Sequence, residues 1–423
     1  MPKAALWGAA FLLSWTAGCG RSDEKATAGP GTPDAQRQAA AQIDKLRALP
    51  YAGYAPGGAD EHDDGVVTCD PQRSCPGYNL YIAHQLSRAE LIDAQGNIVR
   101  SWEYEPSQFW HNGELLADGD FLVVGTQPSN QLMPTIADDR RYVLRFNWDG
   151  DLLWKRRLPA HHDIELTPRD HFLTLTFERR HLPEIDPQHS TRDDRLTLLS
   201  QGGRVLEALS LYDLLSPRPD VFPLLPVDMT ITGGKPWIDL FHCNSVEWVH
   251  HEHLEGKHPI YAPDNVLICF RHQNRVAVVS WDRKEVVWAW GADELASPHD
   301  AHVLESGNIL VFDNGVGRGW SRVIELDPLR KEIIWEYRVP NPTDFYTVSQ
   351  GSNQRLPNGN TPITESEKGR AFEVTPDGRI VWEFWCPHKN QAGQRATIVR
   401  TTRYERAFVE AIQARYASPA SRP

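Results

Sequence analysis

The sequence predicts an all-β protein: a six-bladed β-propeller of four-stranded antiparallel blades, with a short C-terminal helix. Three observations lead to this fold. A hairpin-forming unit recurs six times, a second unit recurs between its copies, and tryptophan recurs at one place in the first unit. The chain has 423 residues, of which 40% are hydrophobic and 24% charged, so it can bury a large core. All-β units often reach this size as one domain, so we expect a single propeller over residues 49–423.

The first unit is an apolar strand, a polar turn and a second strand. Its alternation of apolar and polar residues about a turn is typical of a β-hairpin. The copies cover residues 89–104, 142–157, 195–210, 275–290, 322–337 and 370–385. Trp154, Trp288, Trp335 and Trp382 occupy the same place in four copies, and the last two intervals are 47 residues each. That spacing is close to the size of a four-stranded propeller blade.

The second unit lies in five of the gaps between those hairpins. It covers residues 111–124, 162–175, 242–269, 299–312 and 351–364. One copy of each unit together makes four strands, which is the content of a blade. Residues 76–84 are expected to supply the inner strands of the first blade. Residues 400–416, at the chain end, fit a terminal helix better than a strand.

Histidine recurs at the first position of the second unit. His111, His162, His242 and His299 occupy it in four copies, and the fifth copy has Gly351. Because the innermost strand of each blade lines the channel, equivalent positions lie at equal height around the axis. We therefore expect four imidazoles to converge at one mouth of the channel. The alternative is that histidine merely suits a turn at the blade top and bonds to the backbone.

Further polar residues accompany the histidines. Asn244 lies two residues after His242 and points the same way by the period-two rule. The strand that returns beside this box places Arg271 near both of them. The equivalent position next to His299 is Asn314, which can orient that histidine. These side chains surround a space of the size of a small anion.

Such a group suits sulfuryl transfer. A neutral imidazole attacks when one ring nitrogen is held by a partner and the other carries the lone pair. The three oxygens of a sulfuryl group carry delocalised charge, which a planar guanidinium and N–H donors stabilise. A sulfated histidine divides the transfer into two steps. The reaction then needs no cofactor, metal or nucleotide.

Several segments make the sequence similar to the bacterial arylsulfate sulfotransferases. They are HCNSVEW, FRHQN, HDAHVLESGNILVFDNGVGR, QRLPNGNTPITESEKGRAFEVTPDGRIVWEF and the early GVVTCDPQRSCPGYNLY. The resemblance covers roughly residues 64–410. It implies a phenolic sulfate as donor, a phenol as acceptor and a covalent sulfohistidine, without a nucleotide sulfate donor.

The resemblance also implies roles for individual residues. His299 matches the nucleophile of the His-Asp-Ala box, and Arg271 matches the sulfate-binding arginine. His242 and Asn244 match a His-x-Asn pair. His162, or its neighbour His161, matches the remaining catalytic histidine, and the repeat alignment favours His162. We expect Asn244, His111 and Asn314 to bind substrate.

Two other functions remain open at this stage. The histidine ring could hold a metal in a lyase or hydrolase, since neutral imidazoles suit zinc. The propeller could also be a non-catalytic binding or scaffold lipoprotein. A histidine-rich insertion at residues 250–258 is expected to be a solvated loop or a lid over the channel, with metal binding as the alternative.

The N-terminus predicts export and anchoring. Residues 1–19 read as a lipoprotein-type signal peptide, with Lys3 before a short apolar run and Cys19 at the cleavage site as the lipidated residue. Residues 20–48 predict a flexible tether. We therefore expect a lipoprotein that the lipid on Cys19 anchors to the membrane, on the periplasmic side or at the cell surface.

Charge and cysteines limit the other partners. The net charge of -12 argues against nucleic acid, whose phosphates need a concentrated basic face. No Cys-x-x-Cys pair is present, so a structural zinc site of the usual spacing is not expected. Cys69 and Cys75 could close a short loop, and Cys243 and Cys269 are expected on neighbouring strands.

Overall fold

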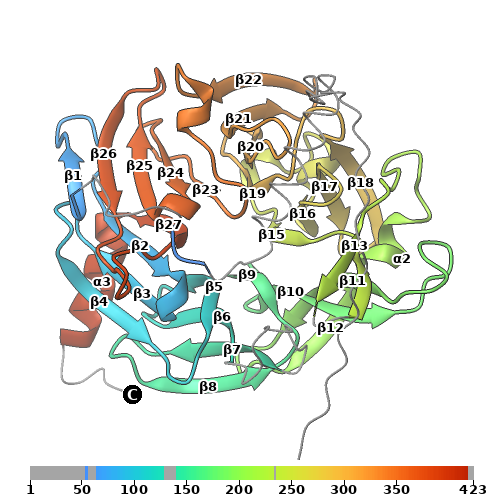
Figure 1. The fold of residues 1–423 in the computed structure, drawn as a ribbon, viewed down its shortest axis with the longest axis horizontal. Coiled ribbons are helices and arrows are strands. Elements are labelled where there is room, and N and C mark those ends of the chain that lie inside the picture. Colours follow the sequence, from blue (N-terminus) through green and yellow to red (C-terminus); the bar gives the residue numbers. More distant parts are fainter. Residues whose placement is uncertain (1–52, 56–62, 128–139, 233–234, 418–423) are drawn as a thin grey trace, which may run out of the picture.

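The computed structural model describes residues 53–55, 63–127, 140–232 and 235–417. In these residues six β-sheets stand as blades around a central channel, with their innermost strands toward the axis (Figure 1). The predicted six-bladed β-propeller is therefore confirmed. The predicted signal peptide, Cys19 and the tether over residues 20–48 lie outside the described residues.

We number the blades in chain order. Blade 1 contains β2 (Tyr78–Ala83), β3 (Arg88–Ile92), β4 (Ile98–Glu103) and β27 (Ile398–Tyr404). Blade 2 contains β5 (Phe109–Leu115), β6 (Phe121–Thr126), β7 (Arg141–Phe146) and β8 (Leu152–Arg157). Blade 3 contains β9 (His161–Leu166), β10 (Phe172–Arg180), β11 (Thr191–Leu199), β12 (Val205–Ser210), β13 (Met229–Thr232) and β14 (Lys235–Asp239).

The second half of the ring follows the same plan. Blade 4 contains β15 (Cys243–Trp248), β16 (Asn265–Phe270), β17 (Arg275–Ser280) and β18 (Glu285–Trp290). Blade 5 contains β19 (His299–Val303), β20 (Ile309–Asp313), β21 (Arg322–Asp327) and β22 (Glu332–Tyr337). Blade 6 contains β1 (Gly65–Cys69), β23 (Ser352–Asn353), β24 (Thr361–Glu365), β25 (Arg370–Val374) and β26 (Ile380–Trp385). The helices are α2 (Leu211–Leu215), α3 (Arg406–Ala417) and the 3-10 turns η1 (His84–Leu86), η3 (Glu252–Leu254), η4 (Pro259–Tyr261), η5 (Pro342–Asp344) and η6 (Ser366–Lys368).

The repeated tryptophans link neighbouring blades. The six predicted hairpins form β3–β4, β7–β8, β11–β12, β17–β18, β21–β22 and β25–β26. In four of them the recurring indole N–H donates to a backbone carbonyl in the outer turn of the next blade, at 2.9–3.1 Å. The donors are Trp154, Trp288, Trp335 and Trp382, and the acceptors are Gln201, Pro328, Pro376 and Ala94. The sequence repeat therefore reflects a repeated contact between blades.

Blade 1 is completed by the end of the chain. Residues 76–84 do supply a strand, β2, but the innermost strand is β27, which pairs with β2 in antiparallel register. The helix predicted over residues 400–416 is therefore wrong in its first part, which is strand β27. It is correct in its second part, which is α3 and begins at Arg406. By pairing with β2, β27 joins the end of the chain to the first blade and closes the ring, and this pairing overrides local helix preference in β27.

Two blades carry more than four strands. At the outer edge of blade 6, β1 pairs with β26 as a fifth strand. In blade 3, β14 pairs in parallel with β11, and β13 pairs with β14. The other four blades have the predicted four antiparallel strands.

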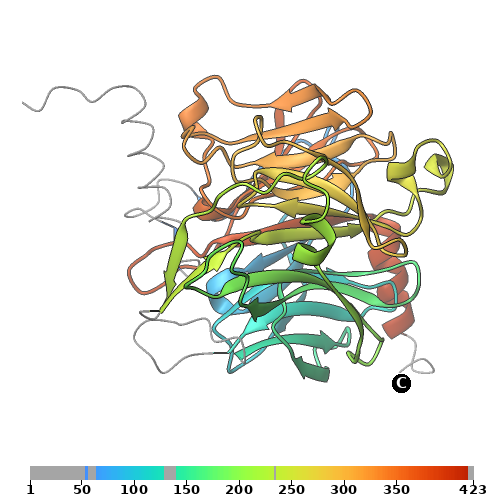
Figure 2. The ribbon, with the colours of Figure 1, turned by 90° about the vertical axis from the view of Figure 1, so that its right-hand side faces the viewer.

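The hydrophobic core lies between the blades. Six clusters of buried apolar side chains fill the six blade-to-blade interfaces of the described residues. Val409 and Ile412 of α3 join the cluster between blades 1 and 2. A Cβ at Gly119, in the β5–β6 turn, would lie 2.9 Å from Cγ2 of Ile412, so α3 packs against the end of blade 2 that is remote from His111. Figure 2 shows α3, in red, at one face of the ring.

The described cysteines are thiols, and the described helices are short. Cys69, Cys75, Cys243, Cys269 and Cys386 are all free. Cys243 and Cys269 lie on neighbouring strands as predicted, but a bulge places them opposite Phe270 and Ser245.

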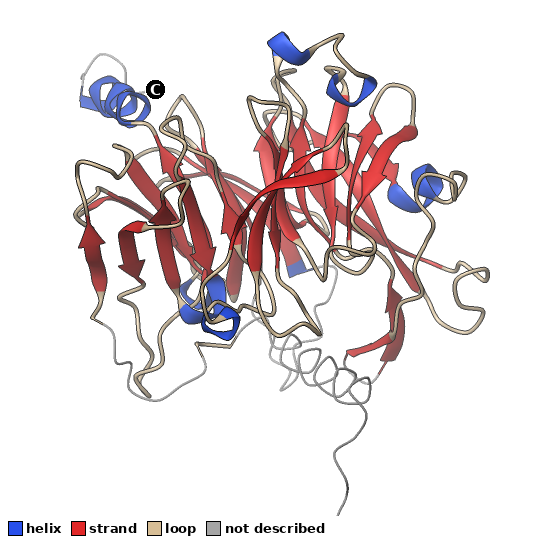
Figure 3. Cartoon of the chain, turned by 90° about the horizontal axis from the view of Figure 1, so that it is seen from above, coloured by secondary structure: helices blue, strands red, loops and turns tan. Residues whose placement is uncertain are grey.

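Among the helices of the described residues, none has the length and apolar character that a membrane span requires. Figure 3 shows how small the helical part of the molecule is beside its strands.

Candidate active site

Imidazole rings from neighbouring blades meet at one mouth of the channel. The ring centroids of His111 and His162 lie 5.1 Å apart, and those of His162 and His242 lie 5.0 Å apart. His299 lies in the wall of the same cavity as His111 and His162. The side chains of His111, His242 and His299 are buried, and that of His162 is partly buried. The propeller thus brings together histidines that are far apart in the sequence.

In four blades a β-bulge lies at the first position of the second unit, where the histidine stands (the histidine box). The inner pairings β5–β6, β9–β10, β15–β16 and β19–β20 all change register there. The backbone φ is 59° at His162, 47° at His242 and 52° at Asp300. Bulges re-aim the side chains beside them and are frequent next to active sites. The period-two rule therefore fails at the box, and the bulge sets where each side chain points.

Blade 6 cannot hold a histidine at the equivalent position. Gly351 has a φ of 102°, which side chains rarely adopt. A Cβ at this position would lie 2.6 Å from Cε1 of Phe312. Close packing against blade 5 thus explains why the fifth copy of the box has glycine.

A cavity lies at this mouth of the channel and is lined mainly by polar side chains. Its wall contains His111, Asn112, His162, Asn244, His299, Asp300, Gln350, Gly351, Val399 and Arg400. Asn244, predicted to point the same way as His242, lines the cavity. His242 and Arg271 are not in its wall, but the ring of His242 packs against that of His162, and the charge of Arg271 acts on His299. Asn314, predicted to bind substrate, is not in the wall and contacts His299 instead.

Asn314 determines where the proton of His299 lies. The side-chain amide of Asn314 donates to the backbone oxygens of Thr347, at 2.9 Å, and Gln350, at 2.7 Å. Its oxygen therefore faces Nδ1 of His299, 2.7 Å away, and must accept a hydrogen from it. Nε2 of His299 then carries the lone pair, which accepts a hydrogen bond from the backbone N–H of Gln350 at 3.3 Å. This is the tautomer that a nucleophilic imidazole requires.

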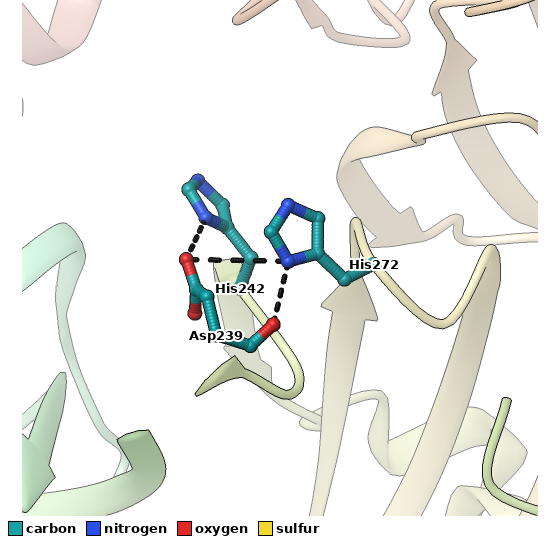
Figure 4. Close-up of side chains that lie close together, drawn as sticks. All are labelled: Asp239, His242 and His272. Atoms are coloured by element: carbon teal, nitrogen blue, oxygen red, sulfur yellow. Dashed lines mark hydrogen bonds and ion pairs between the residues drawn. The ribbon is translucent and has the colours of Figure 1, made fainter. Parts of the chain in front are cut away.

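Asp239 holds two further histidines (Figure 4). Its Oδ2 accepts from Nδ1 of His242 at 2.5 Å, and its backbone oxygen accepts from Nδ1 of His272 at 2.6 Å. Both Nδ1 atoms carry hydrogen, so neither can ligate a metal in this arrangement. Although burial opposes it, the charge of Arg192 lowers the pKa of Asp239 well below its usual value. An ionised Asp239 leaves His242 with its lone pair on Nε2, as in a carboxylate-imidazole pair that acts as a general base.

Arg271 is a buried cation with unused hydrogen-bond capacity. Its Nη1 donates to Nε2 of His272 at 2.9 Å, and its backbone N–H donates to the carbonyl of His242 at 3.3 Å. Its Nε has no hydrogen-bond partner among the described residues. The described carboxylates form no ion pair with it either. A buried guanidinium without a carboxylate partner is suited to bind an anionic group.

The histidines of the site are neutral at neutral pH. Burial lowers the pKa of His299 to about 3, and the positive charge of Arg271 adds to this effect. Burial also lowers the pKa of His242 to about 3, although Asp239 opposes the change. For His111 and His162, burial holds the pKa well below 6.5. Each neutral ring therefore has one nitrogen that carries a lone pair.

Several solved structures are similar to this chain at low sequence identity. Among solved structures it is similar to a protein of unknown function from Bacteroides caccae, at 13% identity and a TM-score of 0.47, over 78% of this chain and 99% of that one. Virginiamycin B lyase from Staphylococcus aureus has 11% identity and a TM-score of 0.43, over 76% and 87%. The Cps50 (Swd1) propeller domain of Myceliophteria thermophila has 11% identity and a TM-score of 0.42, over 80% and 90%. No curated protein matches the sequence.

The family is decided by a match to a family model that covers more than half of the chain. Residues 140–387 match the family model of the arylsulfotransferases (ASST). The chain belongs to the arylsulfotransferase family. The matched residues run from blade 2 to blade 6 and include His162, His242, Arg271 and His299.

In this arylsulfotransferase-family protein the floor of the cavity holds a second guanidinium, which the sequence analysis missed. Arg400 projects from β27 to Asp163 of blade 3, at 3.5 Å, and to Asp300 of blade 5. His302 pairs with Asp300 at 3.2 Å and with Glu247 at 2.9 Å. Although burial opposes it, these carboxylates raise the pKa of His302 to about 10. The charged groups here are therefore paired with one another, whereas Arg271 has no carboxylate partner among the described residues.

The structure separates the adjacent histidines of blade 3. His162 faces the cavity, whereas His161 is fully buried behind it. Nε2 of His161 lies 2.9 Å from Nη2 of Arg192, 3.3 Å from the backbone oxygen of Thr176 and 3.4 Å from Oδ1 of Asp194. Its Nδ1 lies 2.7 Å from Nδ1 of His162, so one of the two Nδ1 atoms donates to the other. His161 thus positions His162.

Other site residues also escaped the sequence analysis. The ring of His84 lies 5.8 Å from that of His111 and extends the histidine series into blade 1. Asp239 precedes His242 by three residues, and His272 directly follows Arg271. These short spacings were visible signals. Arg400 had none, because the segment around it was assigned to a helix.

Proposed function

We propose that this protein transfers a sulfuryl group from a phenolic sulfate to a phenol through a sulfated His299. The observation that carries the proposal is the state of His299. Its Nδ1–H is held by Asn314, its Nε2 carries the lone pair, and its ring lines the cavity. The charge of Arg271, which has no carboxylate partner among the described residues, acts on this ring. Membership of the arylsulfotransferase family supports the same chemistry.

In the first step, Nε2 of His299 attacks the sulfur of the donor. The N–S bond forms while the bond between sulfur and the phenolic oxygen breaks, and the phenolate leaves and takes a proton from water. Arg271 stabilises the negative charge on the sulfuryl oxygens through charge-assisted hydrogen bonds. The neutral state of His299, whose pKa is about 3, keeps the nucleophile active at neutral pH.

In the second step, the acceptor phenol attacks the sulfur of sulfated His299. The phenol gives its proton to Nε2 of His242, the new S–O bond forms and the N–S bond breaks. Asp239 stabilises the resulting imidazolium, which returns the proton to water. Oδ1 of Asn244 is buried and has no hydrogen-bond partner among the described residues, so it can accept from the hydroxyl of the incoming phenol.

The test uses a chromogenic aryl sulfate with a phenol acceptor. The wild type should release the donor phenol and form the acceptor sulfate, and intact-mass analysis without acceptor should find one SO₃ unit on the peptide that contains His299. His299→Ala should lose both signals while keeping its melting temperature. Release that depends on added metal and disappears with a chelator, without the sulfated peptide, would support the metal-dependent alternative and reject this proposal.

We also propose that the protein acts outside the cytoplasm, tethered by a lipid on Cys19. The apolar run before Cys19 and the polar tether after it support this placement. Replacement of Cys19 by alanine should move the protein from the membrane fraction to the soluble fraction. An unchanged distribution would reject the anchor.

A further inference from the structure

A second histidine cluster lies away from the candidate active site. The insertion between β15 and β16 contains η3 and η4 and follows Trp248, at the end of β15 opposite to His242. It therefore lies at the other face of the propeller and does not cover the mouth that holds the histidine ring. In Figure 2 this segment, in yellow, protrudes from the same face as α3. The lid suggested by the sequence is thus not a lid over the candidate active site.

Three side chains of this region point their donor atoms at one another. They are His251 and His253 of the insertion and Glu305 of the β19–β20 turn in blade 5. One donor atom from each lies within 4.8 Å of the other two. Nδ1 of His251 is 3.3 Å from Oε1 of Glu305, and Nδ1 of His253 is 3.6 Å from Oε2. In a tetrahedral zinc site with bonds of about 2.0–2.2 Å, neighbouring ligand atoms are separated by roughly 3.3–3.6 Å.

The other ring nitrogens show which atoms carry hydrogen. Nε2 of His251 bonds to the backbone oxygen of Val303 at 3.2 Å, and Nε2 of His253 bonds to that of Glu305 at 2.7 Å. A carbonyl oxygen only accepts, so both Nε2 atoms must donate. In the neutral rings both Nδ1 lone pairs then face the carboxylate. Metal-bound histidines have this arrangement, with the second nitrogen donating to a backbone carbonyl.

The cluster differs in this respect from Asp239, His242 and His272. There both Nδ1 atoms donate to Asp239, so a metal has no lone pair to bind between them. In His251 and His253 the Nε2–H donates to a backbone oxygen instead. The lone pairs of the two Nδ1 atoms therefore face the carboxylate of Glu305, with no hydrogen-bond donor between them. Such a group of acceptors is suited to bind a cation.

Both sides of the cluster are held in place. The hydroxyl of Tyr261 donates to the backbone oxygen of Gly307 at 2.8 Å, which ties the insertion to the turn that carries Glu305. Leu254, next to His253, is buried in the cluster of apolar side chains between blades 4 and 5. A divalent ion at this point would link the insertion of blade 4 to blade 5.

We propose that His251, His253 and Glu305 bind a divalent transition-metal ion of the zinc class, with solvent as the remaining ligand. Imidazole nitrogen and carboxylate oxygen are ordinary zinc ligands. The site serves to fasten the insertion to the neighbouring blade. It is separate from sulfuryl transfer and does not depend on that proposal.

The experiment measures zinc binding by the purified, chelator-treated full chain. We expect one tight site, a rise in melting temperature on zinc addition, and tetrahedral-type absorption bands when cobalt replaces zinc. His253→Ala and Glu305→Gln change exposed side chains, so both variants should fold and bind zinc at least tenfold more weakly. His250→Ala, an exposed histidine of the same insertion outside the cluster, is the matched control and should bind like the wild type.

The channel histidines could also bind zinc, so His162→Ala is measured in parallel. The proposal requires this variant to keep the tight site. It is overturned if His253→Ala and Glu305→Gln bind zinc as tightly as the wild type, or if His162→Ala loses the site. Absence of tight binding in the wild type would equally reject it.

Discussion

The side-chain oxygen of Asn314 lies 2.7 Å from Nδ1 of His299 and fixes its tautomer. Asn314 is itself fixed, because its amide nitrogen donates to two backbone carbonyls. His299 begins β19, and Asn314 directly follows β20 of the same blade. This hydrogen bond is the basis of the first prediction.

Asn314→Leu should lower kcat of the proposed sulfuryl transfer by roughly 10- to 100-fold, the usual effect of losing a partner that orients a reactive group. KM for the donor should change little, because Asn314 is not in the cavity wall. Asn314→Asp retains the accepting oxygen and should recover part of the loss. Steady-state kinetics with a chromogenic aryl sulfate provides the measurement, and equal kcat in all three proteins would contradict the assigned role.

Arg271→Gln should lower kcat/KM for an aryl sulfate by roughly 100- to 1,000-fold, since it removes a preorganised donor for the charge of the transferring group. Arg271→Lys should recover little, because a point charge lacks the planar fork that binds two oxygens. Arg156→Gln, which removes an exposed arginine of β8, is the control and should match the wild type. Inhibition by free sulfate should weaken in the Arg271 variants, and unchanged inhibition would argue that the anion binds elsewhere.

Asp239→Asn should separate the two steps. Because His242 takes the proton of the acceptor phenol, its misorientation should slow turnover by roughly 10- to 100-fold. The first release of donor phenol, equal to one per enzyme, should persist. Rapid mixing without and with acceptor measures both steps. Asp220→Asn, a surface carboxylate that pairs with Arg218, serves as control, and loss of the first release together with turnover would place Asp239 in the first step instead.

Stability should fall as the pH drops from about 7 to about 5. Burial lowers the pKa of six histidines: His111, His161, His162, His242, His272 and His299. Below about pH 6.5 each binds a proton only in the unfolded chain, so each lowers the free energy of unfolding by about 1.4 kcal/mol per pH unit. Burial raises the pKa of Glu114 to about 8 and holds that of Glu165 well above 4.5, and these two groups oppose the trend.

The six histidines outnumber the two glutamates, so the net effect is destabilisation in acid. Calorimetric melting at pH 7.5, 6.5 and 5.5 tests this expectation. Replacement of His162 by glutamine should reduce the change of the free energy of unfolding with pH by the contribution of one proton, about 1.4 kcal/mol per pH unit. A melting temperature that stays constant or rises toward pH 5.5 would show that the ring histidines are already protonated in the folded protein.

Much of the fold could be predicted from repetition. Each outer hairpin carries its own alternation and turn, and the recurring tryptophans mark contacts that each blade makes with the next. β27 could not be found in this way, because its partner β2 lies more than 300 residues earlier in the chain. A strand that is stabilised only by a distant partner has no local signal of its pairing.

The candidate site divides along the same line. The sequence by itself determined which blades present histidines and that Arg271 returns beside His242, because repeat position implies height around the axis. Only the tertiary structure decided the proton positions on His299 and His242, the pairing of Arg400 with Asp163 and Asp300, and the face on which His251 and His253 lie. Those properties depend on bulges and on hydrogen bonds between distant residues, which a linear pattern of residue types does not encode.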